Sequence, residues 1–177
     1  MNPLTDAKLW KNPLGFSFRL NHTALHFNVP VYNWIEKKYG LTRPQFVVLS
    51  SLHLRDDSTA QDICISSGFP KNTISRAVLR TIALKLVTSR VDPDDNRRLL
   101  LQLTRAGRAI VDEAIPVLIR KEDELLSTLT REERRQLEYL LERVIIGQID
   151  QGATAVASPA EPARSRPASA QKLRNTA

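Results

Sequence analysis

One segment of the sequence, residues 87–104, limits the choice of folds more than any other. Two runs rich in β-branched residues and leucine, near residues 87–91 and 98–104, flank a loop of Asp, Pro, Asp, Asp and Asn. Such runs around turn-forming residues predict a β-hairpin in a chain whose other segments have helical spacing. The loop ends in Arg97 and Arg98, so the hairpin tip combines three aspartates with two arginines.

Helices are predicted between the N-terminus and this hairpin. Apolar residues recur at intervals of three and four from about residue 14 to 39, and Pro30 inside this run predicts a kink. Three further helices are expected near residues 41–53, 58–68 and 70–87. The first two begin at capping pairs, Thr42 with Gln45 and Ser58 with Gln61. Residues 1–13 are polar and contain two prolines, and they are expected to form a flexible lead.

Two longer helices are predicted after the hairpin. Thr104 is placed to cap a helix that runs to about residue 126, and Thr130 with Glu133 forms a capping box for a helix to about residue 149. Beyond that helix the composition shifts to Ala, Ser, Pro, Thr, Arg and Gln, with almost no large apolar residue. Such a segment cannot bury a core, so residues 150–177 are expected to be a disordered tail.

Length and composition exclude several classes of protein. The 177 residues suffice for one domain with a core, and 42% hydrophobic with 25% charged residues is ordinary for a soluble protein. No run approaches the roughly 20 apolar residues of a membrane-spanning helix, and the first residues lack an apolar signal core. The single cysteine, Cys64, excludes an internal disulfide. A cytoplasmic protein is therefore expected, with no membrane partner.

Positive charge is concentrated in and before the hairpin. The formal net charge is +7, and residues 70–108 hold nine Lys or Arg against three Asp, whereas residues 112–143 hold nine acidic and six basic residues. Clustered cations can neutralise phosphates and release counterions. Charged runs are usually solvated helix faces. These charges, however, fall where a helix–turn–helix followed by a hairpin, a winged helix–turn–helix, would touch DNA.

The sequence resembles the multiple antibiotic resistance regulator (MarR) family of bacterial transcription factors from about residue 41 to 141. The similarity rests on the order and spacing of five motifs, LTRPQFVVL, NTISRAVLR, DPDDNRR, LTRAGR and LTREERRQLEYLLERV. It implies a homodimer of winged helix–turn–helix subunits whose fourth helix enters the major groove and whose wing reaches the minor groove. Members of this family often repress a nearby operon and release DNA when a small phenolic or aromatic ligand binds.

The expected fold class is therefore mainly α (α+β), a winged helix–turn–helix with long N- and C-terminal dimerisation helices. The resemblance assigns the first helix and the last two helices to dimerisation. The expected parts in chain order are a flexible lead (1–13), an N-terminal dimerisation helix kinked near Pro30 (14–40), a winged DNA-binding domain (41–104), C-terminal dimerisation helices (105–149) and a disordered tail (150–177).

The resemblance also assigns roles to the hairpin tip. The Asp-x-Arg wing motif of the family falls on Asp95 and Arg97, so Arg97 is expected to enter the narrow, electronegative minor groove. Asp95 is expected to accept hydrogen bonds from the arginine side chain or the loop backbone and to hold the tip in shape. Asp92 and Asp94 are expected to form the turn beside Pro93.

Positions on the basic helix supply the other candidate DNA contacts. Groove contacts are expected from Asn72, Thr73, Ser75 and Arg76, and phosphate contacts from Lys71, Arg80 and Arg98. Leu79 stands where the family usually has a polar residue and Thr81 where it usually has an apolar one. This exchange predicts a slightly rotated helix or a different base-reading face. Lys85 replaces the glycine that usually ends the helix.

Aromatic and cationic residues of the first helix form a candidate pocket for an aromatic carboxylate ligand. The pocket residues are Phe18, Arg19, His22, His26 and Tyr32. Ordinary core or dimer-interface roles are the alternative for each of them. His22 and His26 lie four residues apart and could instead ligate zinc, although no third ligand is near in the sequence. Cys64 could sense oxidants, but its place in the short helix favours an inert, buried thiol.

Catalysis has little support, because no nucleophile elbow, P-loop, GxGxxG or HExxH motif occurs. No enzyme activity and no cofactor are expected. The predicted function is a dimeric, sequence-specific regulator of transcription, a repressor released from a near-palindromic operator by a small phenolic or aromatic-carboxylate ligand. The alternatives are a metal- or redox-responsive regulator of the same fold and a protein-interaction module that does not bind DNA.

Overall fold

The computed structural model describes residues 1–150, so the predicted tail lies outside the described residues except for Asp150, which ends a helix. The helices are α1 (Pro3–Trp10), α2 (Gly15–Tyr39), α3 (Arg43–Leu54), α4 (Ala60–Ser67), α5 (Lys71–Ala83), α6 (Arg105–Leu125) and α7 (Arg131–Asp150). The strands are β1 (Val87–Val91) and β2 (Leu99–Leu103), which pair antiparallel with Val87 opposite Leu103. The predicted class, mainly helical with one hairpin, is confirmed, and the hairpin follows five helices where four were expected.

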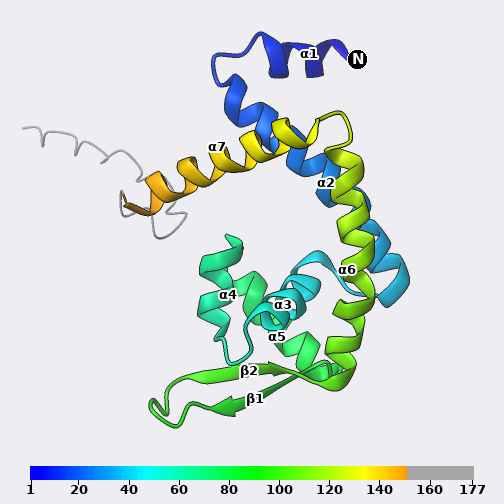
Figure 1. The fold of residues 1–177 in the computed structure, drawn as a ribbon. Coiled ribbons are helices and arrows are strands. Elements are labelled where there is room, and N and C mark those ends of the chain that lie inside the picture. Colours follow the sequence, from blue (N-terminus) through cyan, green and yellow to red (C-terminus); the bar gives the residue numbers. More distant parts are fainter. Residues whose placement is uncertain (151–177) are drawn as a thin grey trace, which may run out of the picture.

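The elements form two ends joined by a helical connection (Figure 1). Helices α3, α4 and α5 lie together with the hairpin at the lower end. Helices α1 and α7 lie with the first part of α2 at the upper end. Helix α6 runs from the end of β2 up to α7 and packs against α2. These two long helices therefore connect the lower end of the molecule to the upper end.

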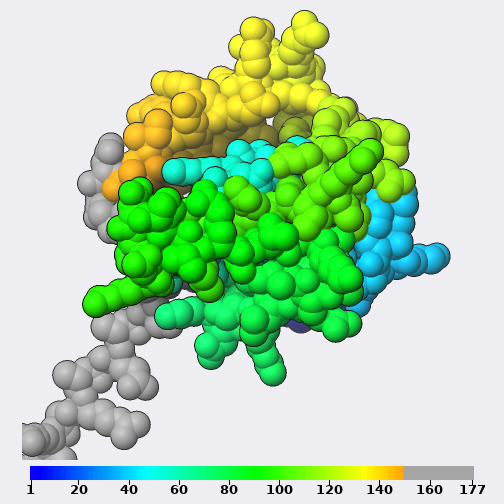
Figure 2. Space-filling view, turned by 90° about the horizontal axis from the view of Figure 1, so that it is seen from below, coloured from blue at the N-terminus to red at the C-terminus, as the bar shows by residue number. Residues whose placement is uncertain are grey.

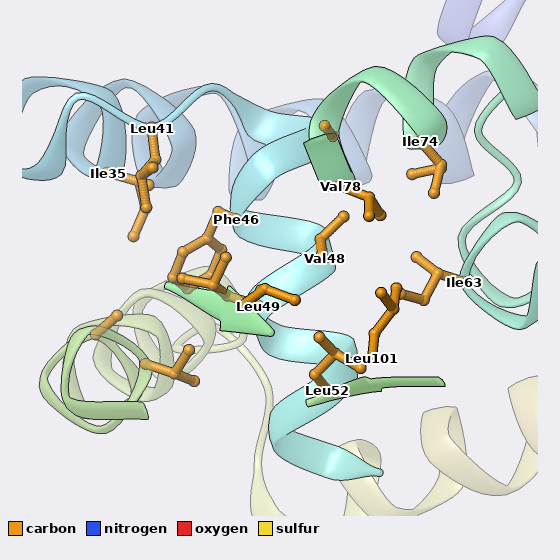
Figure 3. Packing of buried hydrophobic residues seen from close by; sticks show 14 of the residues in the cluster. Ile35, Leu41, Phe46, Val48, Leu49, Leu52, Ile63, Ile74, Val78 and Leu101 are labelled. Carbon is orange, nitrogen blue, oxygen red and sulfur yellow. The ribbon is translucent and has the colours of Figure 1, made fainter. Parts of the chain in front are cut away.

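Helix α3 is the centre of the core (Figure 3). Its residues Phe46, Val48, Leu49 and Leu52 are all at most 2% exposed. Five other elements bring apolar side chains to this helix: Ile35 comes from α2, Ile63 from α4, Ile74 and Val78 from α5, Leu101 from β2 and Val111 from α6. Because every one of these elements packs on α3, the helix fixes their orientation relative to one another.

The capping pairs are confirmed at three helices and shifted at one. The amide of Thr42 donates to Gln45 Oε1 at 2.8 Å, and Thr104 Oγ1 accepts from the amide of Gly107 at 3.0 Å. A reciprocal Thr130–Glu133 box opens α7. The expected cap of α4 was wrong by one residue, because the box is formed by Thr59 with Asp62. Ser58 instead forms a β-bridge to Leu101.

The lead was also wrongly expected to lack structure, because residues Pro3–Trp10 form α1. Asn2 caps this helix by accepting from the amide of Leu4 at 2.8 Å, and Pro3 suits the first helical position. Arg19 of α2 then holds the end of α1. Its Nε donates to the carbonyl of Leu9 at 3.0 Å. Pro30 lies inside a helix that is assigned without a break from Gly15 to Tyr39, so the kink stays a prediction.

The passage from α5 into the hairpin needs a left-handed residue, and Lys85 supplies it with φ of 58°. The amides of Lys85 and Leu86 close the helix by donating to the carbonyls of Ile82 and Thr81. Gly107 lies beside this turn, where an added Cβ would meet the carbonyl oxygen of Leu86 at 2.1 Å. The glycine of the LTRAGR motif therefore allows α6 to approach the end of α5 closely.

We predict that Lys85→Gly raises the free energy of unfolding by about 1 kcal/mol. A left-handed conformation costs a residue with a Cβ about 1–2 kcal/mol, and the greater backbone entropy of glycine in the unfolded chain offsets roughly 0.5–1 kcal/mol of that gain. Urea denaturation of the wild type, Lys85→Gly and the control Lys85→Ala measures the effect. A glycine variant no more stable than the alanine variant would contradict the strain at this turn.

Candidate nucleic-acid interface

Helix α5 presents a polar, cationic face to solvent. Ile74, Ala77 and Val78 are buried against α3 and α4, which turns the opposite side of the helix outward. Of the predicted DNA contacts on α5, Lys71, Asn72, Arg76 and Arg80 are exposed, and Thr73 and Ser75 are half-buried. This face is part of the lower surface of the molecule, where α4 and α5 lie close to the hairpin (Figure 2).

The exchange of polar and apolar residues at positions 79 and 81 is visible in the burial of their side chains. Thr81 is fully buried, and its Oγ1 donates to the carbonyl of Val78 at 2.9 Å, so its hydroxyl is satisfied within the helix. Leu79 is 69% exposed. This exchange puts a leucine on the solvent face of the helix, and the rotation of α5 stays a prediction.

A shallow groove of about 270 Å³ separates the first turns of α3 and α5. Thr42, Pro44 and Gln45 line it from α3, and Asn72, Thr73, Arg76 and Ala77 line it from α5. Three of the predicted groove contacts, Asn72, Thr73 and Arg76, are thus brought together beside the N-terminus of a second helix. Because the Thr42–Gln45 capping box closes the first turn of α3, the cationic side chain of Arg76 is what makes this groove attractive to an anion such as a phosphate.

Aspartates shape the loop between β1 and β2. Oδ1 of Asp92 accepts from the amide of Asp94 at 3.0 Å, and Oδ1 of Asp95 accepts from the amide of Arg97 at 3.0 Å. The amide of Arg98 donates to the carbonyl of Asp95, and that of Asp92 to the carbonyl of Arg98. The carboxylates therefore order the backbone of the tip, as expected of Asp92 and Asp95.

The two arginines of the tip differ in their surroundings. Within residues 1–150, no ion pair involves the side chain of Arg97, which is exposed at the end of the hairpin. Arg98 lies 3.8 Å from Oδ2 of the nearly buried Asp92 and is half exposed. Arg97 is thus available to an anionic partner, whereas Arg98 already has a weak partner inside the loop.

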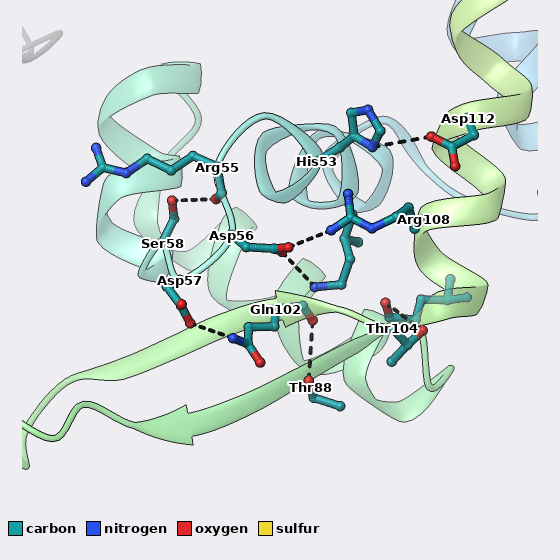
Figure 4. A network of polar contacts seen from close by, with 12 residues as sticks. His53, Arg55, Asp56, Asp57, Ser58, Thr88, Gln102, Thr104, Arg108 and Asp112 are labelled. Carbon is teal, nitrogen blue, oxygen red and sulfur yellow. Dashed lines mark hydrogen bonds and ion pairs between the residues drawn. The ribbon is translucent and has the colours of Figure 1, made fainter.

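Two residues that sequence reasoning passed over, Asp56 and Asp57, anchor the base of the hairpin (Figure 4). Asp56 accepts from the amide of Leu103 at 3.1 Å and pairs with the guanidinium of Arg108 on α6. Asp57, at a left-handed φ of 62°, accepts from Gln102 at 2.9 Å and pairs with Arg90 at 3.0 Å. Their partners lie more than 30 residues away, so the sequence carried no local signal for these contacts.

A polar cluster also joins α2 to α6. Glu113 accepts hydrogen bonds from Lys38 and from the hydroxyl of Tyr39. The hydrogen bond with Glu113 raises the pKa of Lys38, and the same contact, with that of Tyr39, lowers the pKa of Glu113. The pKa of Tyr39 is raised mainly by desolvation and, to a lesser degree, by its hydrogen bond to Glu113. His53 lies 3.6 Å from Asp112 and adds a contact between α3 and α6.

The candidate ligand residues do not form one pocket. Phe18 and His22 line a cavity of about 230 Å³ between α1 and α2, together with Lys8 and Leu9 of α1. Arg19 points to α1 instead, with its guanidinium 4.8 Å from the ring centre of Trp10. His26 Nδ1 lies 3.2 Å from the carbonyl of His22. Tyr32 packs near Phe46 and stacks with Arg43, more than a helical turn further on.

The metal and redox alternatives gain no support from the described residues. The rings of His22 and His26 are 4.2 Å apart, but no group of three or more His, Cys, Asp or Glu side chains able to hold a metal occurs in residues 1–150. Burial raises the pKa of the Cys64 thiol, which Lys71 lowers to a lesser degree. A thiol with a raised pKa is a poor nucleophile, which favours the inert cysteine expected from the sequence.

Comparison with known proteins identifies the fold. The profile of the MarR family matches residues 39–98. The repressor NicR of Pseudomonas putida is 31% identical over 105 residues, which are 59% of this chain and 66% of NicR. The crystal structure of Bordetella bronchiseptica BpsR is 27% identical, with a TM-score of 0.63 over 73% of this chain and 97% of that one. The chain belongs to the MarR family.

A MarR-family structure with bound DNA has the same fold. Mutant Escherichia coli MarR complexed with operator DNA superposes with a TM-score of 0.65 over 74% of this chain and 94% of that one, at 23% identity. The region matched by the family profile includes α3, α4, α5, β1 and the wing tip. No helix within residues 1–150 has both the length and the apolar character needed to cross a membrane.

We predict that Asp56→Ala lowers the free energy of unfolding by about 1–2 kcal/mol, because the half-buried amide of Leu103 loses its acceptor. Asp56→Asn keeps an acceptor for that amide and loses only the exposed ion pair, so it should cost about 0.5 kcal/mol. Urea denaturation measures both, with Asp94→Ala as a control on an exposed aspartate of the same fold. Equal stability of all three variants would contradict the anchoring role.

Proposed function

We propose that this MarR-family protein is a dimeric, sequence-specific DNA-binding regulator, and that it acts as a repressor released from its operator by a small aromatic carboxylate or phenol. Two separate cationic groups on the lower surface carry the proposal. Arg76 and Arg80 are exposed on α5, and Arg97 is exposed at the wing tip. A helix and a wing can together occupy a major groove and the adjacent minor groove.

The wing geometry supports the role of Arg97 in particular. Asp95 fixes the backbone of Arg97 through the amide, while the arginine side chain keeps no ion pair within residues 1–150. An ordered loop that presents an unpaired guanidinium loses little entropy on binding. Insertion of an arginine into a narrow minor groove is favoured by its strong negative potential. We therefore assign minor-groove contact to Arg97 and loop ordering to Asp95.

Exposed apolar side chains at the upper end support a homodimer. Helix α7 leaves large apolar residues in solvent, among them Leu140, Val144, Ile145, Ile146 and Ile149, and α2 leaves Leu20 and Leu25. A patch of this kind favours association, and a second copy would cover it in the manner implied by the family. A two-fold dimer requires a near-palindromic operator with half-sites about 10 base pairs apart.

The effector proposal rests on two relatives and one cavity. NicR is a transcriptional repressor, and the DNA binding of BpsR is regulated by 6-hydroxynicotinic acid, an aromatic carboxylate. In this chain the cavity between α1 and α2 combines the ring of Phe18 with the cationic Lys8 and with His22. We propose this cavity as the effector site, with Lys8 facing the carboxylate.

We predict that the full chain binds a duplex from the intergenic DNA beside its own gene more tightly than a scrambled duplex, with a steep dependence on salt. Arg76→Ala should weaken binding to the specific duplex about tenfold, because a bidentate base contact contributes about 1–3 kcal/mol. Fluorescence anisotropy at several salt concentrations measures both effects.

Arg131→Ala on α7 is the matched control, since it removes the same charge far from the proposed interface and should leave affinity unchanged. Loss of affinity for both duplexes alike in Arg76→Ala would make Arg76 a phosphate contact. No binding to any duplex at low salt would contradict the proposed function and favour a protein-interaction module.

We predict that 6-hydroxynicotinic acid lowers the anisotropy of the bound duplex, and that Lys8→Ala raises the concentration for half-release about fivefold. An exposed charge pair contributes up to about 1 kcal/mol, which corresponds to that factor. Lys37→Ala, which removes an exposed charge near the other end of α2, is the control and should respond like the wild type. Unchanged release in Lys8→Ala would place the effector elsewhere.

A further inference from the structure

The exposed face of α5 holds one large apolar side chain. Leu79 is 69% exposed, with Arg80 beside it in the sequence and Arg76 one turn before it. Ala83, one turn later, is exposed as well. Leu79 therefore lies within the cationic surface proposed to meet DNA, and not on the margin of the hydrophobic core.

The packing of α5 holds Leu79 in solvent. A rotation large enough to bury it would bring Ile74 and Val78, now 0% and 7% exposed, toward water. The buried position two residues later is taken by Thr81, whose hydroxyl is satisfied by the carbonyl of Val78. Leu79 thus stays exposed, although the fully buried position two residues later holds a polar residue.

Single exposed leucines are common on protein surfaces, so exposure alone identifies no partner. The location of Leu79 restricts what can cover it. In a major groove, the 5-methyl group of thymine is the apolar feature that distinguishes one base pair from another. Opposite cytosine or guanine, the same leucine would desolvate a polar base edge without replacing its hydrogen bonds with water.

We propose that Leu79 contacts the 5-methyl group of a thymine and selects that base in each operator half-site. This inference rests on the proposed function, because it requires α5 to enter the major groove. Arg76 and Leu79 are three residues apart, which is about 4.5 Å along the helix axis, and stacked base pairs are about 3.4 Å apart. With α5 lying along the groove, the proposed thymine is one or two base pairs from the pair read by Arg76.

Deoxyuridine tests the contact directly, since it removes the methyl group and keeps base pairing. High-affinity duplexes are first selected from a randomised pool with the full chain. Each thymine of the selected duplex is then replaced singly by deoxyuridine, and affinity is measured by anisotropy. At one thymine per half-site the replacement should weaken wild-type binding about fourfold, as expected for loss of one buried methyl group.

The variants separate this contact from other effects of the methyl group on DNA. In Leu79→Ala the penalty at that thymine should disappear, while penalties at other thymines stay. Leu54→Ala is the matched control, because Leu54 is 86% exposed at the end of α3, and it should retain the wild-type penalty. Leu79→Ala is expected to unfold at the wild-type temperature, since its side chain is outside the core.

Two results would overturn the inference. One refutes only the contact of Leu79 with thymine, and the other also refutes the proposed function. A duplex that is selected and bound, but with equal deoxyuridine penalties in the wild type and Leu79→Ala at every thymine, refutes the contact and leaves the proposed function standing. Failure to select any duplex above background refutes the proposed function and the inference together.

Discussion

The packing of α5 on α3 is the contact on which the rest of the structure depends. Ile74 and Val78 enter a core built around Val48 and Leu52, and this determines which residues of α5 face outward (Figure 3). With those two residues inside, Arg76, Leu79 and Arg80 can only be outside. The chemistry of the proposed DNA face is thus a direct consequence of hydrophobic burial on the other side of the same helix.

The wing is held relative to α5 by different forces. Asp56 and Asp57 connect the turn after α3 to both strands and to α6, and Ser58 extends the pairing to Leu101. The glycine at position 107 lets α6 begin against the end of α5. Glu113 on α6 also contacts Lys38 and Tyr39 of α2. A continuous chain of contacts therefore joins the wing and α5 to the proposed dimerisation helices. A ligand between α1 and α2 could act on DNA binding through that link.

The helices, the hairpin and most caps were predictable because their signals are local. Thr42, Thr104 and Thr130 each act within four residues of their partners, and the aspartates of the wing order a loop of seven residues. The cap of α4 moved by one residue because Ser58 pairs with Leu101, a contact across 43 residues. Helix α1 has local signals in Asn2 and Pro3, but it is short, and the contact that holds it comes from Arg19 on another helix. The contacts of Asp56 and Asp57 could not be predicted either, because their partners are distant in the sequence. For the same reason the sequence did not show that the candidate ligand residues lie apart.

If α5 and the wing bind adjacent grooves of a two-fold operator, hydroxyl-radical footprinting of the full chain on its selected duplex will reveal both contacts. We expect two protected patches about 10 base pairs apart, each with a flanking minor-groove protection that Arg97→Ala removes while the other protection stays. Uniform protection, or a footprint that Arg97→Ala leaves unchanged, would contradict this mode of binding.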